Sequence, residues 1–266
     1  MIGAALLGKS RTGSRNLLLA VCAATLLGTA PASGESRAPA VLGARSGETV
    51  VLLHGLARGP RSMGRIGDHL EDSGYDVHSL GYPTLQAPLE EALGAVRAGL
   101  GDCCQEARRL HFVTHSLGGI MLRAHLEEAL PENLGRVVMI APPNAGSELA
   151  DQLGRLWLLP RLLGPIARQL GTDADSLPNR LGPPRFEFGV IAGTRAIHPL
   201  GWFWIPGVSD GTVALENTKL PEMRDFVSVT NSHSWILRDD RVAELVVEFL
   251  QEGAFPSAQD TPGRDG

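Results

Sequence analysis

The stretch that decides the fold is Thr114-His115-Ser116-Leu117-Gly118-Gly119. It follows the apolar run 110–113 and precedes the helix-like run 120–130. A serine in a sharp turn between a strand and a helix projects its hydroxyl from the top of a sheet. Ser116 would then be a nucleophile, and the backbone N–H of Leu117 would face a developing oxyanion. The alternative is a glycine-rich turn that carries an incidental serine.

Thr114 is the one departure from the usual pattern G-x-S-x-G, whose first position is glycine. A small residue is favoured there because strand and helix approach each other closely at the turn. We therefore expect the larger threonine to affect packing rather than chemistry.

Strands and helices alternate along most of the chain, which predicts an α/β fold with a mostly parallel central sheet flanked by helices. The expected domain covers residues 48–252. The continuous apolar runs suit strands buried on both faces. Expected strands lie at 48–53, 74–80, 110–113, 136–141, 186–192 and 225–230, and expected helices at 62–73, 88–100, 117–130 and 239–251.

One segment, about 147–185, interrupts the alternation with leucine-rich pieces separated by prolines. An insertion at the carboxyl end of a sheet lies over the crevice where ligands bind, so we expect a small cap or lid. The alternative is a plain crossover with a buried helix. Residues 253–266 are polar and are expected to form a disordered tail.

The first 32 residues resemble an export signal, followed by a linker at 33–47. Three cations precede an apolar run of about a dozen residues, and Ala32 ends a small-residue cleavage site. The chain is therefore expected to be periplasmic or secreted, with an uncleaved membrane anchor as the alternative. Cleavage would remove three cations and no acid, which changes the formal charge from −5 to −8.

Two adjacent cysteines, Cys103 and Cys104, would remain after cleavage. A bridge between neighbours closes a strained small ring, so we expect free thiols in a loop or at a helix end. A redox switch between them is the alternative.

A second oxyanion donor is expected where His54-Gly55-Leu56 follows the first strong strand. Glycine lets the chain turn so that the N–H of Leu56 faces the crevice. His54 is expected to shape this loop by hydrogen bonding. The side chain of His115 is expected to point away from that of Ser116.

The expected base is His233, which lies between the last strand and the last helix, at the edge of the sheet where ligand-facing groups gather. Asp210, in the turn Ser209-Asp210-Gly211, is the expected acid that orients the imidazole. Glu216 is the alternative acid, and Asp210 could instead belong to an ordinary Asp-Gly turn.

With these parts in place, the chain resembles the α/β-hydrolase superfamily, in particular exported bacterial lipase- and esterase-like members. The resemblance spans about residues 48–250 and includes the order Ser116, Asp210, His233. It implies a serine carboxylic-ester hydrolase that needs no cofactor. Some lipases of this superfamily carry a structural calcium ion, but no matching acidic cluster is evident in the sequence.

The expected substrate is an apolar ester or lipid, because the insertion is rich in leucine. Trp202 and Trp204 are expected to line the acyl pocket, with ordinary core or lid packing as the alternative. No basic run suggests nucleic acid, and transient contact with a membrane surface is possible. An acyltransferase with the same triad and a non-catalytic binding protein are the alternative functions. The oligomeric state is not predicted.

Overall fold

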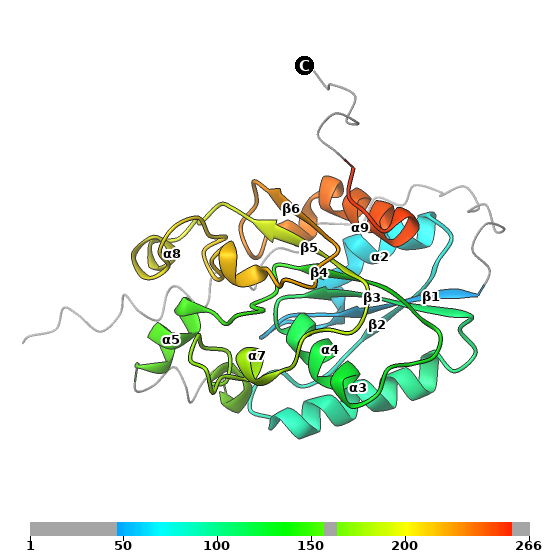
Figure 1. Cartoon of the computed structure of the whole chain (residues 1–266), viewed down its shortest axis with the longest axis horizontal. Helices are drawn as coiled ribbons and strands as arrows, with labels where there is room; N and C mark the ends of the chain where they lie inside the picture. The colour runs from blue at the N-terminus through cyan, green and yellow to red at the C-terminus, as the bar shows by residue number, and fades with distance from the viewer. Residues whose placement is uncertain (1–46, 157–163, 257–266) are drawn as a thin grey trace, which may run out of the picture. The chain divides into compact units, whose positions relative to one another are not determined.

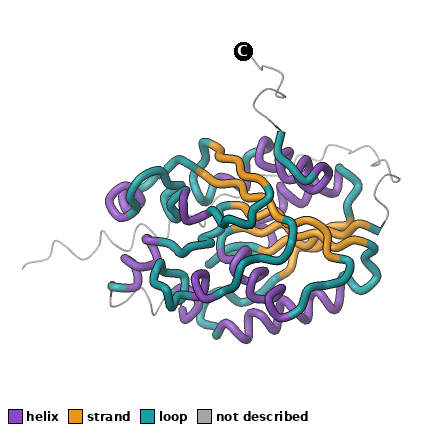
Figure 2. The backbone as a smooth tube through the Cα atoms, in the orientation of Figure 1, coloured by secondary structure: helices purple, strands orange, loops and turns teal. Residues whose placement is uncertain are grey.

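The central element of the computed structural model, which describes residues 47–156 and 164–256, is a six-stranded sheet (Figures 1 and 2). Its strand order is β2-β1-β3-β4-β5-β6, and each pair of neighbours is parallel. The predicted parallel sheet is therefore confirmed. The strands are β1 (Glu48–Leu53), β2 (Asp76–Leu80), β3 (Arg109–His115), β4 (Leu134–Ile140), β5 (Phe188–Gly193) and β6 (Asp225–Val229).

The four predicted helices are all present among the described residues, with shorter elements between them. The long helices are α2 (Gly64–Asp72), α3 (Leu89–Cys103), α4 (Leu117–Glu128) and α9 (Asp240–Glu252). Three short helices were not predicted because each is too short to show a helical apolar period. They are α5 (Glu148–Gly154), α7 (Leu177–Arg180) and α8 (Pro199–Trp204), and single 3₁₀ turns lie at Pro60–Met63, Glu216–Thr218 and Ile236–Arg238.

Successive residues of each strand pack on opposite faces of the sheet, as the period of a strand requires. In β1, Val50 and Leu52 face the core layer formed with α2 and α9, whereas Val51 and Leu53 face the layer formed with α3 and α4. All four side chains are almost completely buried. Since burial of such a side chain contributes roughly 1.5–3 kcal/mol, the two layers hold the strand ends in place.

The carboxyl ends of the parallel strands gather the candidate residues at one edge of the sheet. The His54-Gly55 turn follows β1, Ser116 follows β3, and His233 follows β6. The turn that contains Asp210 lies between β5 and β6. Segments far apart in the sequence therefore meet where ligands bind in open α/β sheets.

The described part of the insertion is tied to the core by a buried arginine of α4. The Arg123 guanidinium donates to the carbonyl oxygens of Asn144, Pro178 and Leu181 at 3.0, 3.2 and 3.4 Å. Burial lowers the pKa of Arg123 to about 10. That the insertion acts as a lid stays a prediction.

The predicted signal peptide, the linker except Gly47, and residues 257–266 of the predicted tail lie outside the described residues. The expectation of disorder is wrong for residues 253–256, because Phe255 is buried against Phe249 and its N–H donates to Asp225 Oδ2 at 2.6 Å. Within the described ranges, no helix combines the length and the hydropathy needed to cross a membrane.

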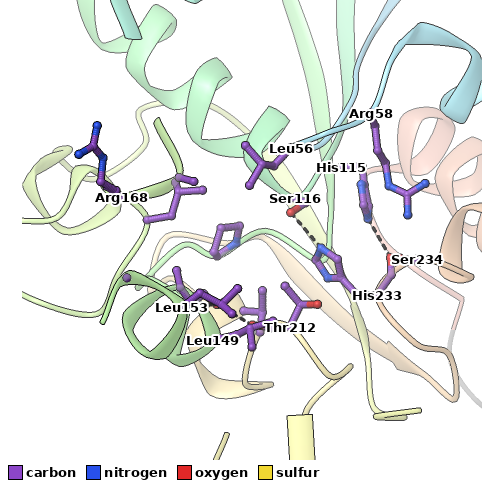
Figure 3. Close-up of a pocket in the computed structure, with 17 residues that line it drawn as sticks. Leu56, Arg58, His115, Ser116, Leu149, Leu153, Arg168, Thr212, His233 and Ser234 are labelled. Carbon is purple, nitrogen blue, oxygen red and sulfur yellow. Dashed lines mark hydrogen bonds between the residues drawn. The ribbon is translucent and has the colours of Figure 1, made fainter. Parts of the chain in front are cut away.

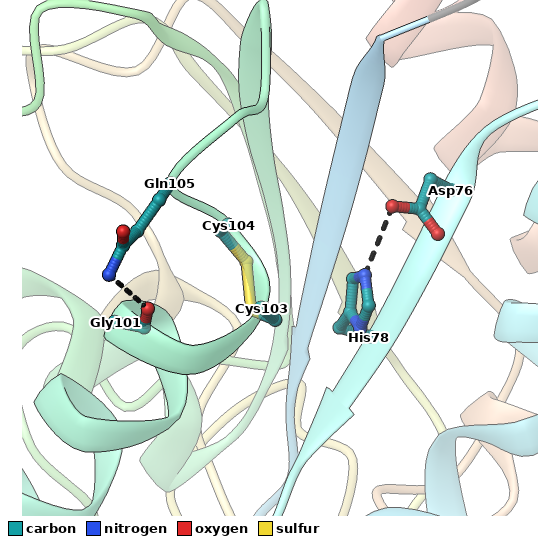
Figure 4. Close-up of a disulfide and its surroundings, with 6 residues drawn as sticks. All are labelled: Asp76, His78, Gly101, Cys103, Cys104 and Gln105. Carbon is teal, nitrogen blue, oxygen red and sulfur yellow. Dashed lines mark hydrogen bonds and ion pairs between the residues drawn. A yellow bond between two sulfur atoms is a disulfide. The ribbon is translucent and has the colours of Figure 1, made fainter.

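The expectation of free thiols at Cys103 and Cys104 is wrong, because the two sulfurs form a disulfide (Figure 4). Cys103 is the last residue of α3, and Cys104 leaves the helix with φ −127° and ψ 12°. This departure from helical geometry turns the two side chains toward each other, which a continuing helix would prevent. The Gln105 side chain caps the same helix end by donating to Gly101 O.

Candidate active site

Ser116 sits in a strained turn between β3 and α4. Its φ of 53° and ψ of −120° are rare for a residue with a side chain, and its N–H donates to Ile140 O at 2.9 Å. Gly118 makes the turn possible, since a Cβ there would lie 2.4 Å from Leu53 O. Such strain persists only where the surroundings hold it, and it presents the hydroxyl at the edge of the sheet.

Thr114 packs inside this elbow, fully buried. A Cβ added at Gly119 would lie 3.3 Å from Thr114 Oγ1 and 3.2 Å from Pro142 Cβ. Thr114 therefore fits inside the elbow, because the residue of α4 that lies against it is a glycine.

His233 is brought to Ser116 as the sequence predicts. Its Nε2 lies 2.9 Å from Ser116 Oγ, and its Nδ1 lies 2.7 Å from Asp210 Oδ2. The carboxylate can only accept, so Nδ1 carries the proton and Nε2 is free to accept from the serine hydroxyl. The His233 N–H also donates to Asp210 O at 3.0 Å, which links the two loops through the backbone.

Asp210 is held as a hydrogen-bonded carboxylate in the predicted tight turn. It is 1% exposed, and its Oδ1 accepts the N–H groups of Thr212 and Val213, both at 2.8 Å. One oxygen is thus occupied by the turn and the other by the histidine, which fixes the imidazole plane.

The alternative acid, Glu216, does not reach this site. Its side chain is 77% exposed and pairs with Lys219 at 2.7 Å. That contact lies within one 3₁₀ turn, a common arrangement for solvated charges.

The two expected oxyanion donors lie beside Ser116. Leu117 is the first residue of α4, where helix N–H groups lack partners within the helix. Leu56 lines the same pocket as Ser116, and a Cβ at Gly55 would lie 3.2 Å from Ser116 Cβ. No hydrogen bond found in the described ranges uses the N–H of Leu56 or Leu117, and their role as oxyanion donors stays a prediction.

His54 shapes this loop, as expected. Its Nδ1 donates to Gly55 O at 3.0 Å, and its ring stacks on Tyr82 with 4.4 Å between centroids. The Tyr82 hydroxyl donates to His54 O. Burial lowers the pKa of His54, which favours the neutral imidazole.

His115 contacts the loop of the candidate base, which the sequence did not predict, and the direction of its side chain relative to that of Ser116 stays a prediction. Its ring lies 4.9 Å from that of His233, and its Nε2 donates to His233 O at 3.0 Å (Figure 3). Strand alternation predicts the face on which a side chain lies, but Ser116 breaks the alternation with its positive φ. Burial, with the nearby His233, holds the pKa of His115 well below its usual range.

A pocket of about 240 Å³ opens at Ser116 and His233 (Figure 3). Its wall is mainly apolar, and α5 contributes one side of it. Arg58, Arg168 and Thr212 also line it; the sequence reasoning missed them because no short motif marks a pocket wall. The apolar members are Leu56, Pro143, Leu149, Ala150, Leu153, Ala167, Leu170 and Val213.

The prediction that Trp202 and Trp204 line this pocket is wrong, because neither is among the described residues that form its wall. Both belong to α8, and Trp202 is 65% exposed. The sequence places them near the acid turn correctly, but the packing of the helix directs Trp202 to the surface.

In the described ranges, no group of three or more His, Cys, Asp or Glu side chains is arranged to hold a metal ion.

No protein-family model matches the chain, and no curated protein matches it by sequence. Solved structures do match. The mature form of lipase BlEst2 from Bacillus licheniformis aligns with a TM-score of 0.62 at 21% identity, over 80% of this chain and 96% of that one. A metagenomic carboxyl esterase aligns with a TM-score of 0.55 at 17% identity, over 85% and 82% of the two chains. An extracellular α/β-hydrolase from a Paenibacillus species aligns with a TM-score of 0.50 at 16% identity, over 76% and 98%.

Proposed function

Given the α/β-hydrolase fold of this chain, we propose that it is a serine carboxylic-ester hydrolase. The observation that carries the proposal is the hydrogen-bonded series Ser116 Oγ, His233 and Asp210, with contacts of 2.9 and 2.7 Å. A fold hosts many chemistries, so the argument depends on the site. Nucleophile, base and orienting acid are all within hydrogen-bond distance, which is what acyl transfer through a serine requires.

In the first half of the reaction, Ser116 Oγ attacks the ester carbonyl carbon while His233 Nε2 takes the hydroxyl proton. The carbonyl oxygen becomes an oxyanion and accepts from the N–H groups of Leu56 and Leu117. Asp210 stabilises the imidazolium through Nδ1–H. The intermediate then collapses, the imidazolium protonates the leaving alkoxide, and an acyl group remains on Ser116.

Water completes the cycle. His233 Nε2 takes a proton from water, and the resulting hydroxide attacks the acyl carbon. A second oxyanion forms in the same position. When it collapses, the proton returns to Ser116 Oγ and the carboxylic acid leaves.

The substrate class follows from the pocket wall beside Ser116. Leu149 and Leu153 of α5 lie across the pocket from Leu56, so an apolar acyl chain can occupy the space between them (Figure 3). Apolar walls with few polar groups are typical of pockets for apolar ligands. We propose an ester with an apolar acyl group, without assigning its length.

We also propose that the protein is exported and that cleavage occurs near Ala32. The basic segment and the apolar run before that position support this location. One matching structure is of a lipase in its mature form.

The test is a series of p-nitrophenyl esters from acetyl to palmitoyl, with wild type and Ser116→Ala. The proposal predicts hydrolysis by wild type and a loss of about 10⁴-fold or more in the variant. Equal rates for both proteins on every ester would contradict it. Product analysis with an added alcohol separates hydrolysis from acyl transfer, because only transfer yields a new ester.

A further inference from the structure

An exposed apolar surface surrounds α8 and takes no part in the proposed chemistry. Phe203 is 83% exposed and Trp202 65%, and three aliphatic neighbours are also exposed. We call this surface the α8 patch. Large exposed apolar patches mark sites of contact with proteins, membranes or ligands, and all five residues here lie within α8 or within four residues of its ends. The patch consists of Ile197, Leu200, Trp202, Phe203 and Val208.

The patch is built on a firmly anchored helix. His198 caps α8 by accepting from Gly201 N–H at 3.1 Å, and Ile205 is buried beneath its end. A Cβ at Gly201 would lie 2.7 Å from Gly211 Cα, so the helix packs directly on the turn that holds the candidate acid. Its exposed side chains therefore have a fixed place on the protein.

Trp202 presents the apolar part of its indole ring to solvent. The ring N–H, the one polar group of the side chain, donates to Ala196 O at 2.9 Å. A tryptophan whose N–H is already satisfied can enter an apolar medium without leaving that donor unpaired.

The patch adjoins the pocket through a single helix. α8 packs against α5, and both lie on the same side of the sheet's carboxyl end (Figure 1). α5 supplies Leu149 and Leu153 to the pocket wall. A surface that binds the α8 patch is thus held close to the pocket that opens at Ser116.

The charge of the protein indicates which kind of surface can bind the α8 patch. Residues 195–208 contain no carboxylate and a single arginine, Arg195. The formal charge after the proposed cleavage is −8, which opposes binding to a strongly anionic surface. Tryptophan and phenylalanine are favoured at the boundary between lipid and water.

We propose that the α8 patch docks the protein on an uncharged or zwitterionic lipid surface, beside the pocket that receives the acyl chain. The proposal rests on the proposed function, because an ester presented in such a surface would then lie next to the pocket. It assigns the docking to Trp202 and Phe203 rather than to the insertion.

The test measures binding separately from hydrolysis, in the Ser116→Ala background with phosphatidylcholine vesicles. We expect vesicle sedimentation to carry the protein down and tryptophan emission to shift to shorter wavelength. Adding Phe203→Ser, which keeps Trp202 as a reporter, should weaken binding about tenfold, since a large apolar side chain no longer enters the lipid. Leu130→Ser, at a 38% exposed leucine after α4, is the control and should change binding less than about twofold.

Lack of vesicle binding by Ser116→Ala, or equal binding with and without Phe203, would overturn the proposal. So would self-association of the protein that Phe203→Ser abolishes while vesicles are not bound, since the patch would then join copies of the chain. Hydrolysis of a water-soluble short-chain ester by Phe203→Ser, with Ser116 intact, should stay within about twofold of wild type. Lack of that hydrolysis in wild type would reject the proposed function while leaving the vesicle result to be judged separately.

Discussion

The imidazole of His115 donates from Nε2 to the backbone oxygen of His233 at 3.0 Å. The two rings are 4.9 Å apart, and His115 is almost completely buried. A side chain next to the candidate nucleophile thus holds the loop of the candidate base. We infer that His115 is a positioning residue for His233.

Two replacements of His115 should distinguish the effect of losing its N–H donor from the effect of losing the volume of its ring. His115→Phe keeps a planar ring but cannot donate, and we expect kcat to fall about tenfold to 100-fold with little change in KM. His115→Gln carries an N–H₂ group of similar reach and should recover much of the loss. Steady-state kinetics on a soluble ester measures both. Equal losses in the two variants would show that packing rather than the donor matters.

Asp210→Asn should reduce kcat by about 10⁴-fold, as expected when the tautomer of a catalytic histidine is reversed. The Asn Oδ1 would keep the N–H groups of Thr212 and Val213, because these bonds need an acceptor. The amide N–H₂ would then face Nδ1, which would have to accept and so place its proton on Nε2. Circular dichroism should remain unchanged. Retention of full activity would remove Asp210 from the proposed triad.

Alanine at the two glycines of the elbow should have unequal effects. A Cβ at Gly118 would lie 2.4 Å from a backbone oxygen of Leu53, which cannot move without disturbing β1. At Gly119 the nearest atoms are 3.2 and 3.3 Å away and belong to the side chains of Pro142 and Thr114. We expect Gly118→Ala to lose nearly all activity or fail to fold, and Gly119→Ala to retain most of it. The double variant Thr114→Gly/Gly119→Ala should be at least as active as Gly119→Ala. Activity assays of the three purified variants measure this order of activities, and the reverse order would contradict the prediction.

Acid should destabilise the fold partly through His111, which is 1% exposed and whose Nδ1 accepts the N–H of Arg136 at 3.0 Å. Burial lowers the pKa of His111 to about 4, although Glu48 lies 3.5 Å from Nε2. An unfolded histidine titrates near pH 6.5, so the unfolded chain binds this proton first as pH falls. Protonation of His111 therefore leaves the free energy of unfolding unchanged above about pH 6.5. It lowers that free energy, by up to about 3 kcal/mol, as the pH falls to about 4.

His111→Asn tests this assignment, because its carbonyl oxygen can still accept from Arg136 N–H. The free energy of unfolding in urea should be lower than that of wild type at about pH 7, and the difference should shrink toward about pH 4. Parallel curves for the two proteins would contradict the assignment.

The order and placement of the elements could be predicted because buried parallel strands are continuous apolar runs and their carboxyl ends meet at one edge. That geometry places the loops that carry Ser116, Asp210 and His233 at one edge of the sheet, and the loops themselves span β4 and β5, which separate β3 from β6. It does not say where Trp202 points, because that depends on Gly201 meeting Gly211 in three dimensions. The contact of His115 with His233 and the Cys103–Cys104 bond depend on residues that leave regular geometry, which no periodicity reveals.

The most direct test of the central claim is labelling of the native protein with a fluorophosphonate, followed by peptide mass spectrometry. A serine activated by His233 should take up about one probe per chain, on the peptide that contains Ser116, and prior unfolding or Ser116→Ala should abolish it. Absence of labelling, or labelling at another residue that persists in Ser116→Ala, would contradict the account.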